Sequence, residues 1–264
     1  HYKWILKCIE NNKKVLVEKP AFQKLTDAKQ IKKKIIEKKL FFSEGFMYRH
    51  HPQIHKIIKI INNNEIGELK SMESSFGTNL LTKKKLFIFN KKKKINPNSR
   101  LFNKELGGGC ILDLGCYPSS FSLFIASQLK KINYENFQIK NIKKEVGETG
   151  VEIDAELEIN FDDKFLSKVK TSFKKDLGSR SIIHGVKGSI LIENTWHGGD
   201  VHININSKKQ VFFQNIKKNI FSYEIENISN DLLENNNEPS YPGTRINDSV
   251  LNTKILDSWI NEKK

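Results

Sequence analysis

The sequence predicts two folds in succession: the last part of a doubly wound α/β domain, then an α+β domain with a large, open antiparallel sheet. Helical and strand patterns alternate through residues 1–64, as in a parallel sheet with helical crossovers. From residue 65 onward, strand patterns with one apolar face follow one another, which is typical of antiparallel sheets. We therefore predict two domains, 1–64 and 65–264.

Three helices and two strands account for the first part. Residues 1–10, 25–39 and 51–64 place apolar side chains at helical spacing, and the short apolar runs 15–18 and 40–46 predict strands. No strand precedes the first helix, and a stable sheet needs more than two strands. We therefore expect this domain to be incomplete in the sequence.

Strand patterns dominate the second part. In 151–161, apolar residues alternate with acidic ones, so one face of this strand is expected to be buried and the other solvated. An apolar helix is expected at 121–129, and two helices, 222–236 and 247–261, close the chain. The remaining strands are expected at 68–76, 165–173, 179–186, 188–194, 200–205 and 209–215.

The charge of the chain does not indicate a nucleic-acid partner. The formal net charge is +15, a value that can bind nucleic acid. The lysines, however, are spread over all 264 residues and do not alternate with aromatic side chains, as they do in a stacking platform. The lysine runs 83–85 and 91–94 are expected to be solvated loops, with a strand or packed loop at 86–90 between them.

Neither a membrane nor a metal is expected as a partner. The sequence contains no run of 18 apolar residues and shows no signal peptide. Its three cysteines lack CxxC spacing, which argues against disulfides and a zinc site and suits a reducing cytoplasm. His51 and His55 have a spacing that can bind metal, but no carboxylate completes the set.

The stretch VLVEKP, residues 15–20, ends a strand with charged side chains. Pro20 cannot continue a β-ladder, and it biases Lys19 towards extended backbone, so Glu18 and Lys19 are presented at the rim of the sheet. Ligands of open parallel sheets bind outside the carboxyl ends of the strands, which makes this rim a candidate site. The alternative is an ordinary strand end with a surface ion pair.

The stretch LGGGCILDLGCYP, residues 106–118, combines glycines with an acid and a phenol. The glycines allow close approach of another group to the backbone. If a helix begins near Gly109, Asp113 and Tyr117 share one of its faces, and Pro118 kinks or restarts that helix. The alternative, a glycine-rich turn before a buried helix, leaves the acid and the phenol unexplained.

Further motifs accompany these two stretches along the chain: VLVEKP is followed by EGFMYRHHPQ (44–53), IGEL (66–69), SRLFNKELGGGCILDLGCYP (99–118) and the closing helices. In this order the motifs are similar to those of the glucose–fructose oxidoreductase / inositol dehydrogenase / rhizopine catabolism (Gfo/Idh/MocA) family, nearest its dihydrodiol dehydrogenase and xylose dehydrogenase branch. The resemblance covers nearly the whole chain. It implies a Rossmann domain followed by an open-faced sheet domain, with NAD or NADP as cofactor.

The resemblance also implies a glycine fingerprint in the first strand–helix turn, which this sequence lacks. At about 30 residues per βαβ unit, we expect on the order of 60–80 N-terminal residues to be absent. The pyrophosphate-binding residues and the residue that selects NAD or NADP are then not assignable.

Oxidation of a hydroxyl needs a base for its proton while a hydride leaves the carbon. A tyrosine pKa of about 10 is lowered by a nearby ammonium, so Lys19 beside Tyr117 is expected to favour the phenolate, with Asp113 holding Lys19. The resemblance implies the same catalytic roles. It further implies a cofactor set and a substrate set: Glu18, Lys19, Pro20 and Arg49 at the cofactor, and Lys19, Arg100, Asp113 and Tyr117 at the substrate.

The main functional hypothesis is an NAD(P)-dependent oxidoreductase that transfers a hydride between a sugar or cyclic polyol hydroxyl and a nicotinamide cofactor. The alternative is a sugar-binding or assembly protein that keeps the fold without hydride transfer. Opposite charges on 151–161 and 165–173 are expected to pair across the polar face of the sheet. Strands 179–186, 188–194 and 209–215 carry apolar residues on both faces, which indicates a homo-oligomer packed through the open sheet.

Overall fold

The first part of the molecule is a small parallel sheet with helices around it. The computed structural model describes residues 1–85, 89–212 and 218–262. Strands β1 (Val15–Glu18) and β2 (Phe42–Gly45) pair in parallel, with Glu18 opposite Gly45, so both strands end at the same edge. The predicted α-β-α-β-α order is confirmed by these strands and by helices α1 (Tyr2–Glu10), α2 (Leu25–Lys38) and α3 (Pro52–Asn62).

One apolar face of each helix fixes this arrangement. Helix α1 buries Ile5 and Ile9, four residues apart, against the small sheet. Helix α3 instead packs into the core beneath the large sheet, although it precedes the predicted domain boundary at residue 64. That boundary stays a prediction. Helix α6 (Ile246–Asn261) contacts both α2 and α4 (Cys116–Ala126), and thereby joins the two parts.

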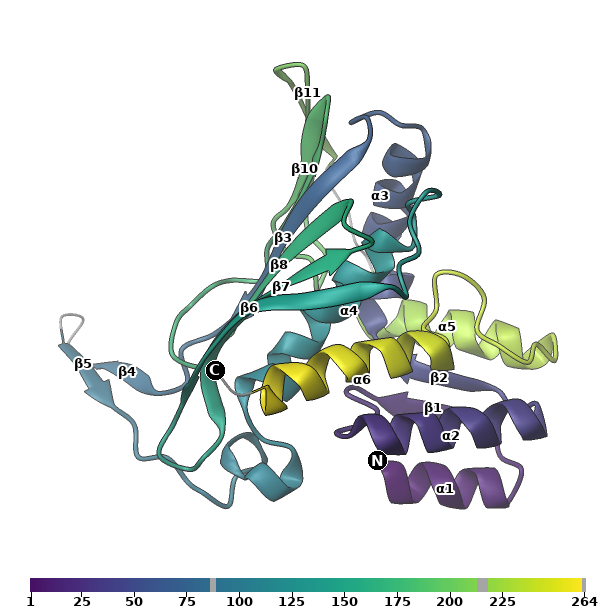
Figure 1. Ribbon diagram of the computed structural model, residues 1–264, viewed down its shortest axis with the longest axis vertical. Coiled ribbons are helices and arrows are strands. Elements are labelled where there is room, and N and C mark those ends of the chain that lie inside the picture. The colour runs from purple at the N-terminus through teal and green to yellow at the C-terminus, as the bar shows by residue number, and fades with distance from the viewer. Residues whose placement is uncertain (86–88, 213–217, 263–264) are drawn as a thin grey trace.

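The second part is built on an eight-stranded sheet (Figure 1). Its strand order is β12-β11-β10-β9-β3-β8-β7-β6. All neighbours are antiparallel except β3 and β8, so the sheet is mixed where the sequence predicted an antiparallel one. The strands are β3 (Leu69–Gly77), β6 (Phe137–Val146), β7 (Glu152–Phe161), β8 (Phe165–Ser172), β9 (Ser181–Gly185), β10 (Gly188–Ile192), β11 (Val201–Ile205) and β12 (Lys208–Phe212).

Helices cover one face of this sheet, and ion pairs line the other. Helices α3, α4 and α6 all lie on the same side of it (Figure 1). On the opposite face the predicted charge pairing between neighbouring strands is confirmed for Lys168 with Glu158 and for Lys170 with Glu156. Glu152 of β7 does not join these pairs because it is buried, and Lys174, just after β8, pairs with Glu145 of β6.

The helix α4 region is the apolar centre of the fold. The stretch Lys104–Ala126 is long and apolar enough to be a candidate membrane span, the one such helix in the described part of the chain. In this fold, however, 94% of its most apolar window is buried inside the protein, as in the core helix of a globular domain. The apolar helix expected at 121–129 is the second half of α4, which ends at Ala126.

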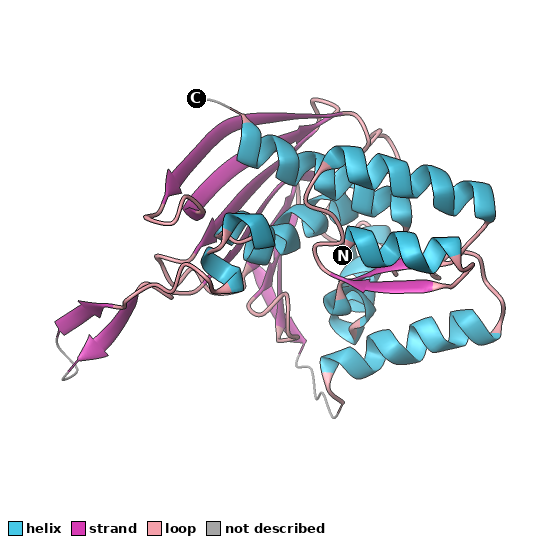
Figure 2. Cartoon of the chain, turned by 90° about the horizontal axis from the view of Figure 1, so that it is seen from below, coloured by secondary structure: helices cyan, strands magenta, loops and turns pink. Residues whose placement is uncertain are grey.

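Two segments differ from the sequence prediction, and parts of two others are not tested. The lysine runs expected as loops form a hairpin, β4 (Thr82–Lys85) and β5 (Phe89–Lys92), which projects from the body (Figure 2). Residues 86–88 of the run expected between them, and residues 213–215 of the last expected strand, lie outside the described residues. Strand β6 was not expected, because a register shift between Lys140 and Lys143 breaks its alternation.

Candidate active site

A cleft of about 690 Å³ opens at the carboxyl end of β1. Glu18, Lys19 and Pro20 line it from the strand end, and Arg100 and Asp113 line it from the segment that leads into α4. Clefts of this size take small molecules and cofactor parts. Five of the residues predicted for the site therefore meet in one cleft, although they come from distant parts of the sequence.

The ammonium of Lys19 is held by one residue in two ways. Its Nζ donates to the backbone carbonyl of Asp113 at 2.7 Å and lies 3.6 Å from Asp113 Oδ1. The Lys19–Pro20 peptide bond is cis. Because an ammonium has three N–H groups and the 3.6 Å contact is longer than a hydrogen bond, at least one donor of Lys19 is left for an oxygen in the cleft.

A wide helical turn leaves the Asp113 carbonyl available. Residues Ile111–Gly115 are π-helical, and α4 follows from Cys116. In a π-helix the donor to the carbonyl of Asp113 is the residue five positions later, which is Pro118 and has no N–H. Lys19 donates to this carbonyl at 2.7 Å, and the Cys116 thiol donates to it at 3.7 Å. The proline expected to kink or restart the helix thus provides the acceptor that holds the lysine.

The carboxylate of Asp113 also contacts a second cation. Nη2 of Arg100 donates to Asp113 Oδ1 at 2.9 Å. The side chain of Arg100 is 61% exposed, so this ion pair contributes little to stability. It orients the carboxylate, and Arg100 itself lines the cleft.

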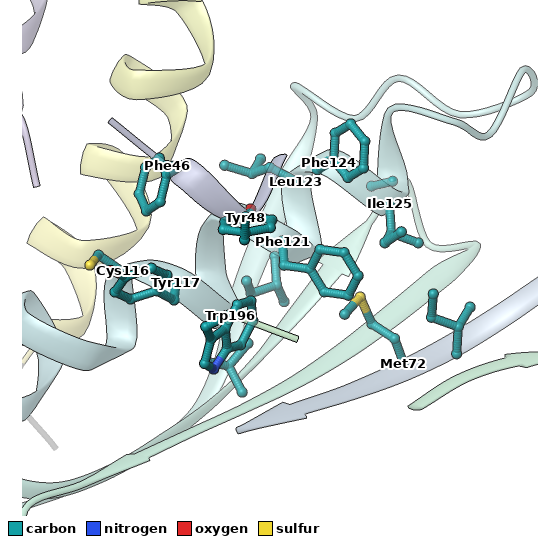
Figure 3. Close-up of a cluster of buried hydrophobic side chains, with 14 of the residues drawn as sticks. Phe46, Tyr48, Met72, Cys116, Tyr117, Phe121, Leu123, Phe124, Ile125 and Trp196 are labelled. Carbon is teal, nitrogen blue, oxygen red and sulfur yellow. The ribbon is translucent and has the colours of Figure 1, made fainter. Parts of the chain in front are cut away.

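Tyr117 is packed in an aromatic cluster (Figure 3). Its ring lies 5.7 Å from that of Phe46 and 5.6 Å from that of Trp196, centre to centre. The Lys19 Nζ lies over the same ring, 4.7 Å from its centre, while the hydroxyl donates to Met47 Sδ at 3.7 Å. Tyr117 is 7% exposed and is not among the residues that line the cleft as described.

Burial raises the pKa of the Tyr117 hydroxyl, and nearby negative groups act in the same direction. The expected lowering by Lys19 is therefore wrong for this structure. The physical reason is the geometry: the ammonium meets the face of the ring and not the oxygen, and removal of the phenol from water outweighs it. Tyr117 keeps its proton at neutral pH in this arrangement.

Arg49 lies away from the cleft. Its Nη1 contacts Asp248 Oδ2 at 3.3 Å and Thr244 Oγ1 at 3.4 Å, and its guanidinium lies 4.6 Å from the centre of the Phe124 ring. The side chain is buried and ties the segment after β2 to the start of α6. The structure thus gives Arg49 a packing contact and does not bring it to the other predicted residues.

Two buried carboxyl groups near the site escaped the sequence reasoning. Glu44 of β2 accepts a hydrogen bond from the N–H of Ala21, the first backbone donor after Pro20, at 2.8 Å. Burial raises its pKa to about 7. Glu224 lies on α5 (Ile220–Leu233), and its pKa is also raised to about 7, by burial and then by Glu18. Glu44 could have been suspected from the sequence, because it interrupts the apolar run 40–46. Glu224 could not, because a glutamate on a helix is common.

Two histidines that do not line the cleft have structural contacts. His51 caps the N-terminus of α3, where its Nδ1 accepts from the N–H of Gln53 at 3.2 Å. His197 lies against Phe76, with ring centres 6.1 Å apart. Within the described residues no three His, Cys, Asp or Glu side chains gather as a metal site.

Comparison with known proteins defines the class of protein. Residues 54–191 match the model of the GFO/IDH/MocA C-terminal domain, and the chain belongs to this family. The resemblance read from its motifs is thereby confirmed.

Several relatives and solved structures are similar to this chain. Trans-1,2-dihydrobenzene-1,2-diol dehydrogenase from Xenopus tropicalis is 25% identical over 269 residues, 99% of this chain and 74% of the relative. A dTDP-3,4-didehydro-2,6-dideoxy-alpha-D-glucose 3-reductase from Saccharopolyspora spinosa is 30% identical over 120 residues, 45% of this chain and 32% of the relative.

Among solved structures, a 3-ketoreductase from Actinomadura kijaniata, in complex with NADP and TDP-benzene, has a TM-score of 0.78 at 18% identity over 98% of this chain and 73% of its own. An aldose–aldose oxidoreductase from Caulobacter crescentus, complexed with glycerol, has a TM-score of 0.79 at 16% identity over 98% of this chain and 72% of its own. These likenesses show the fold.

Proposed function

We propose that the protein is an NAD(P)-dependent oxidoreductase that transfers a hydride between the carbon of a sugar or cyclic polyol hydroxyl and a nicotinamide cofactor. The observation that carries this proposal is the cleft at the end of β1, where Asp113 holds the Lys19 ammonium and one of its donors remains. The family and its diol dehydrogenase and sugar reductase relatives support the same chemistry.

The groups at this edge suit a nicotinamide cofactor. Dinucleotides bind at the carboxyl ends of the strands in doubly wound folds, and Glu18 offers carboxylate oxygens there to ribose hydroxyls. Glu224 adds a buried oxygen with no hydrogen-bond partner among the described residues. We propose that Glu18, Lys19 and Pro20 hold the nicotinamide end. The bound cofactor supplies or accepts the hydride.

Lys19 is proposed to meet the reacting oxygen of the substrate. A positive donor held in place stabilises the negative charge that develops on a carbonyl oxygen as a hydride reaches its carbon. Asp113 fixes the lysine, and the exposed guanidinium of Arg100 is suited to bind a second hydroxyl. Tyr117, which keeps its proton, fits proton donation during reduction better than proton removal by a phenolate.

The test is an assay of the complete gene product, with whatever residues its reading frame places before His1. NADH or NADPH is mixed with a panel of keto sugars and cyclic ketones, and the absorbance of the reduced nicotinamide is followed; the reverse reaction uses polyols and trans-diols with the oxidised cofactors. We expect turnover with one cofactor and one substrate class. Binding of a sugar without any turnover and without binding of either cofactor would favour the alternative, a sugar-binding protein.

Assembly and location are also proposals. We propose a homo-oligomer that packs through the open sheet face, where Leu191 of β10 pairs with Ile182 of β9 and both are part-exposed. The free thiols of Cys8, Cys110 and Cys116 fit a reducing cytoplasm.

A further inference from the structure

Helix α5 brings a carboxyl group to the edge where β1 and β2 end. Glu224 is 6% exposed. A Cβ placed on Gly45, the last residue of β2, would lie 3.7 Å from Glu224 Oε1 and 3.8 Å from the Cα of Glu18. Because Glu18 and Gly45 are partners in the sheet, Glu224 stands at the end of both strands.

The carboxyl group of Glu224 is unsatisfied in the described part of the molecule. Its Oε1 is buried and has no hydrogen-bond partner there. A buried acceptor without a donor is costly, so such groups in native proteins are almost always paired. Glu18, which shares this edge, is acidic and disfavours ionisation of Glu224 further. The site therefore calls for a ligand that brings an N–H or O–H donor.

Gly45 keeps a side chain away from the Glu224 carboxyl. A Cβ there would also come within 3.3 Å of the carbonyl oxygen of Val17, so a larger residue at position 45 would crowd both Val17 and Glu224. Tyr117 belongs to the same surroundings, because Glu224 is among the groups that raise the pKa of its hydroxyl.

Building on the proposed function, we infer that Glu224 binds the carboxamide amino group of the nicotinamide. A dinucleotide lies across the ends of the strands in this fold, and the carboxamide is the part of the nicotinamide that carries N–H donors. A carboxylate that accepts one of these fixes the rotation of the ring. Glu224 then positions the ring so that one defined face meets the substrate.

The test compares the reduced cofactor with its 3-acetylpyridine analogue, in which a methyl group replaces the carboxamide amino group. Dissociation constants are measured by fluorescence on the complete gene product. We expect the wild type to bind the natural cofactor about tenfold more tightly, because the analogue leaves the buried acceptor unpaired. In Glu224→Met, which has a similar length and no strong acceptor, this preference disappears. In Glu224→Gln, whose amide oxygen still accepts, a clear preference remains.

Glu226→Gln is the matched control. Glu226 is on the same helix, is exposed and pairs with Lys218, so its replacement should leave the preference unchanged. Equal affinity of the wild type for the two cofactors overturns the inference and requires no variant. A preference that survives in Glu224→Met, with folding verified by circular dichroism, overturns it as well. If the wild type binds neither cofactor, the proposed function itself fails, so the two failures are distinguishable.

Discussion

The ammonium of Lys19 lies over the face of the Tyr117 ring, 4.7 Å from its centre, and does not reach the hydroxyl. This is a cation–π contact, which stabilises the positive charge without taking the phenol proton. In the proposed mechanism Lys19 is the cation at the reacting oxygen, and the ring of Tyr117, which keeps its proton, lies against it.

Replacement of Lys19 by alanine should lower turnover at least ~100-fold, the scale of a lost acid–base or charge-stabilising group. Steady-state kinetics of the complete gene product measure this. Lys29→Ala, an exposed lysine on α2, is the matched control and should have wild-type kinetics. Turnover near that of the wild type in Lys19→Ala would remove Lys19 from the mechanism.

Tyr117→Phe should also lower turnover at least ~100-fold if the hydroxyl gives its proton to the substrate. The aromatic packing with Phe46 and Trp196 is retained in this variant, so the melting temperature should change little. Kinetics and thermal melting together separate loss of chemistry from loss of fold. An active Tyr117→Phe enzyme would leave the phenol a packing role alone.

Arg100→Ala should raise KM about tenfold and change kcat less, because an exposed guanidinium that binds a substrate hydroxyl contributes equally to the ground state and the transition state. The matched control is Arg180→Ala, an exposed arginine outside the cleft. A large fall in kcat at unchanged KM would instead place Arg100 at the reacting atoms.

Glu44→Gln should alter how stability depends on pH. Burial raises the pKa of Glu44 from 4.5 to about 7, so the folded state binds this proton more tightly than the unfolded state. The wild type therefore loses stability as the pH rises from about 4.5 to 7, whereas glutamine, which keeps an acceptor for the N–H of Ala21, does not. Between these two pH values, the free energy of unfolding of the variant should rise by on the order of 3 kcal/mol relative to that of the wild type.

Urea unfolding at both ends of that pH range measures the difference. The buried His50 and His51, whose pKa values burial lowers to about 4, titrate in the same range but are common to both proteins and cancel. A free-energy difference between variant and wild type that is constant with pH would show that Glu44 does not titrate as described.

Leu191→Lys should dissociate the proposed homo-oligomer. Leu191 and its partner Ile182 place apolar side chains on the open face of the sheet, where a buried lysine is costly. Light scattering at micromolar concentration gives the mass of each form. Ile36→Lys, at an exposed position on α2, is the control and should keep the wild-type mass. A monomeric wild type would contradict the proposed packing.

Much of the fold was accessible from the sequence because its signals are local. The run at 15–18 is the strand β1 as expected, since apolar content and Pro20 define both its type and its end. Strand direction is different: alternation in β3 and β8 is the same for parallel and antiparallel partners, so their parallel pairing left no signal. Strand β6 was missed because it is a half-solvated edge strand with a shifted register.

The parts of the site that lie within one short motif were predictable from the sequence. Glu18, Lys19, Pro20, Arg100 and Asp113 meet as expected, because VLVEKP and the glycine-rich stretch each fix their own local geometry. The contact between Lys19 and the Asp113 carbonyl depends on a π-helical turn, which the residue pattern did not predict. Arg49 and Glu224 depend on how distant helices pack, and such contacts are decided by the whole fold.

The position of β3 in the large sheet has a consequence for how the chain folds. Strands β6–β8 and β9–β12 each form runs of neighbours that are close in sequence, so each meander can form by itself. Strand β3 comes many residues before both meanders in the sequence. In the sheet it lies between them, paired with β8 on one side and β9 on the other. Closing so long a loop is slow, because its entropy is lost before the contacts are gained. The two meanders should therefore acquire protection from hydrogen exchange first, and β3 should join them in the late, rate-limiting step.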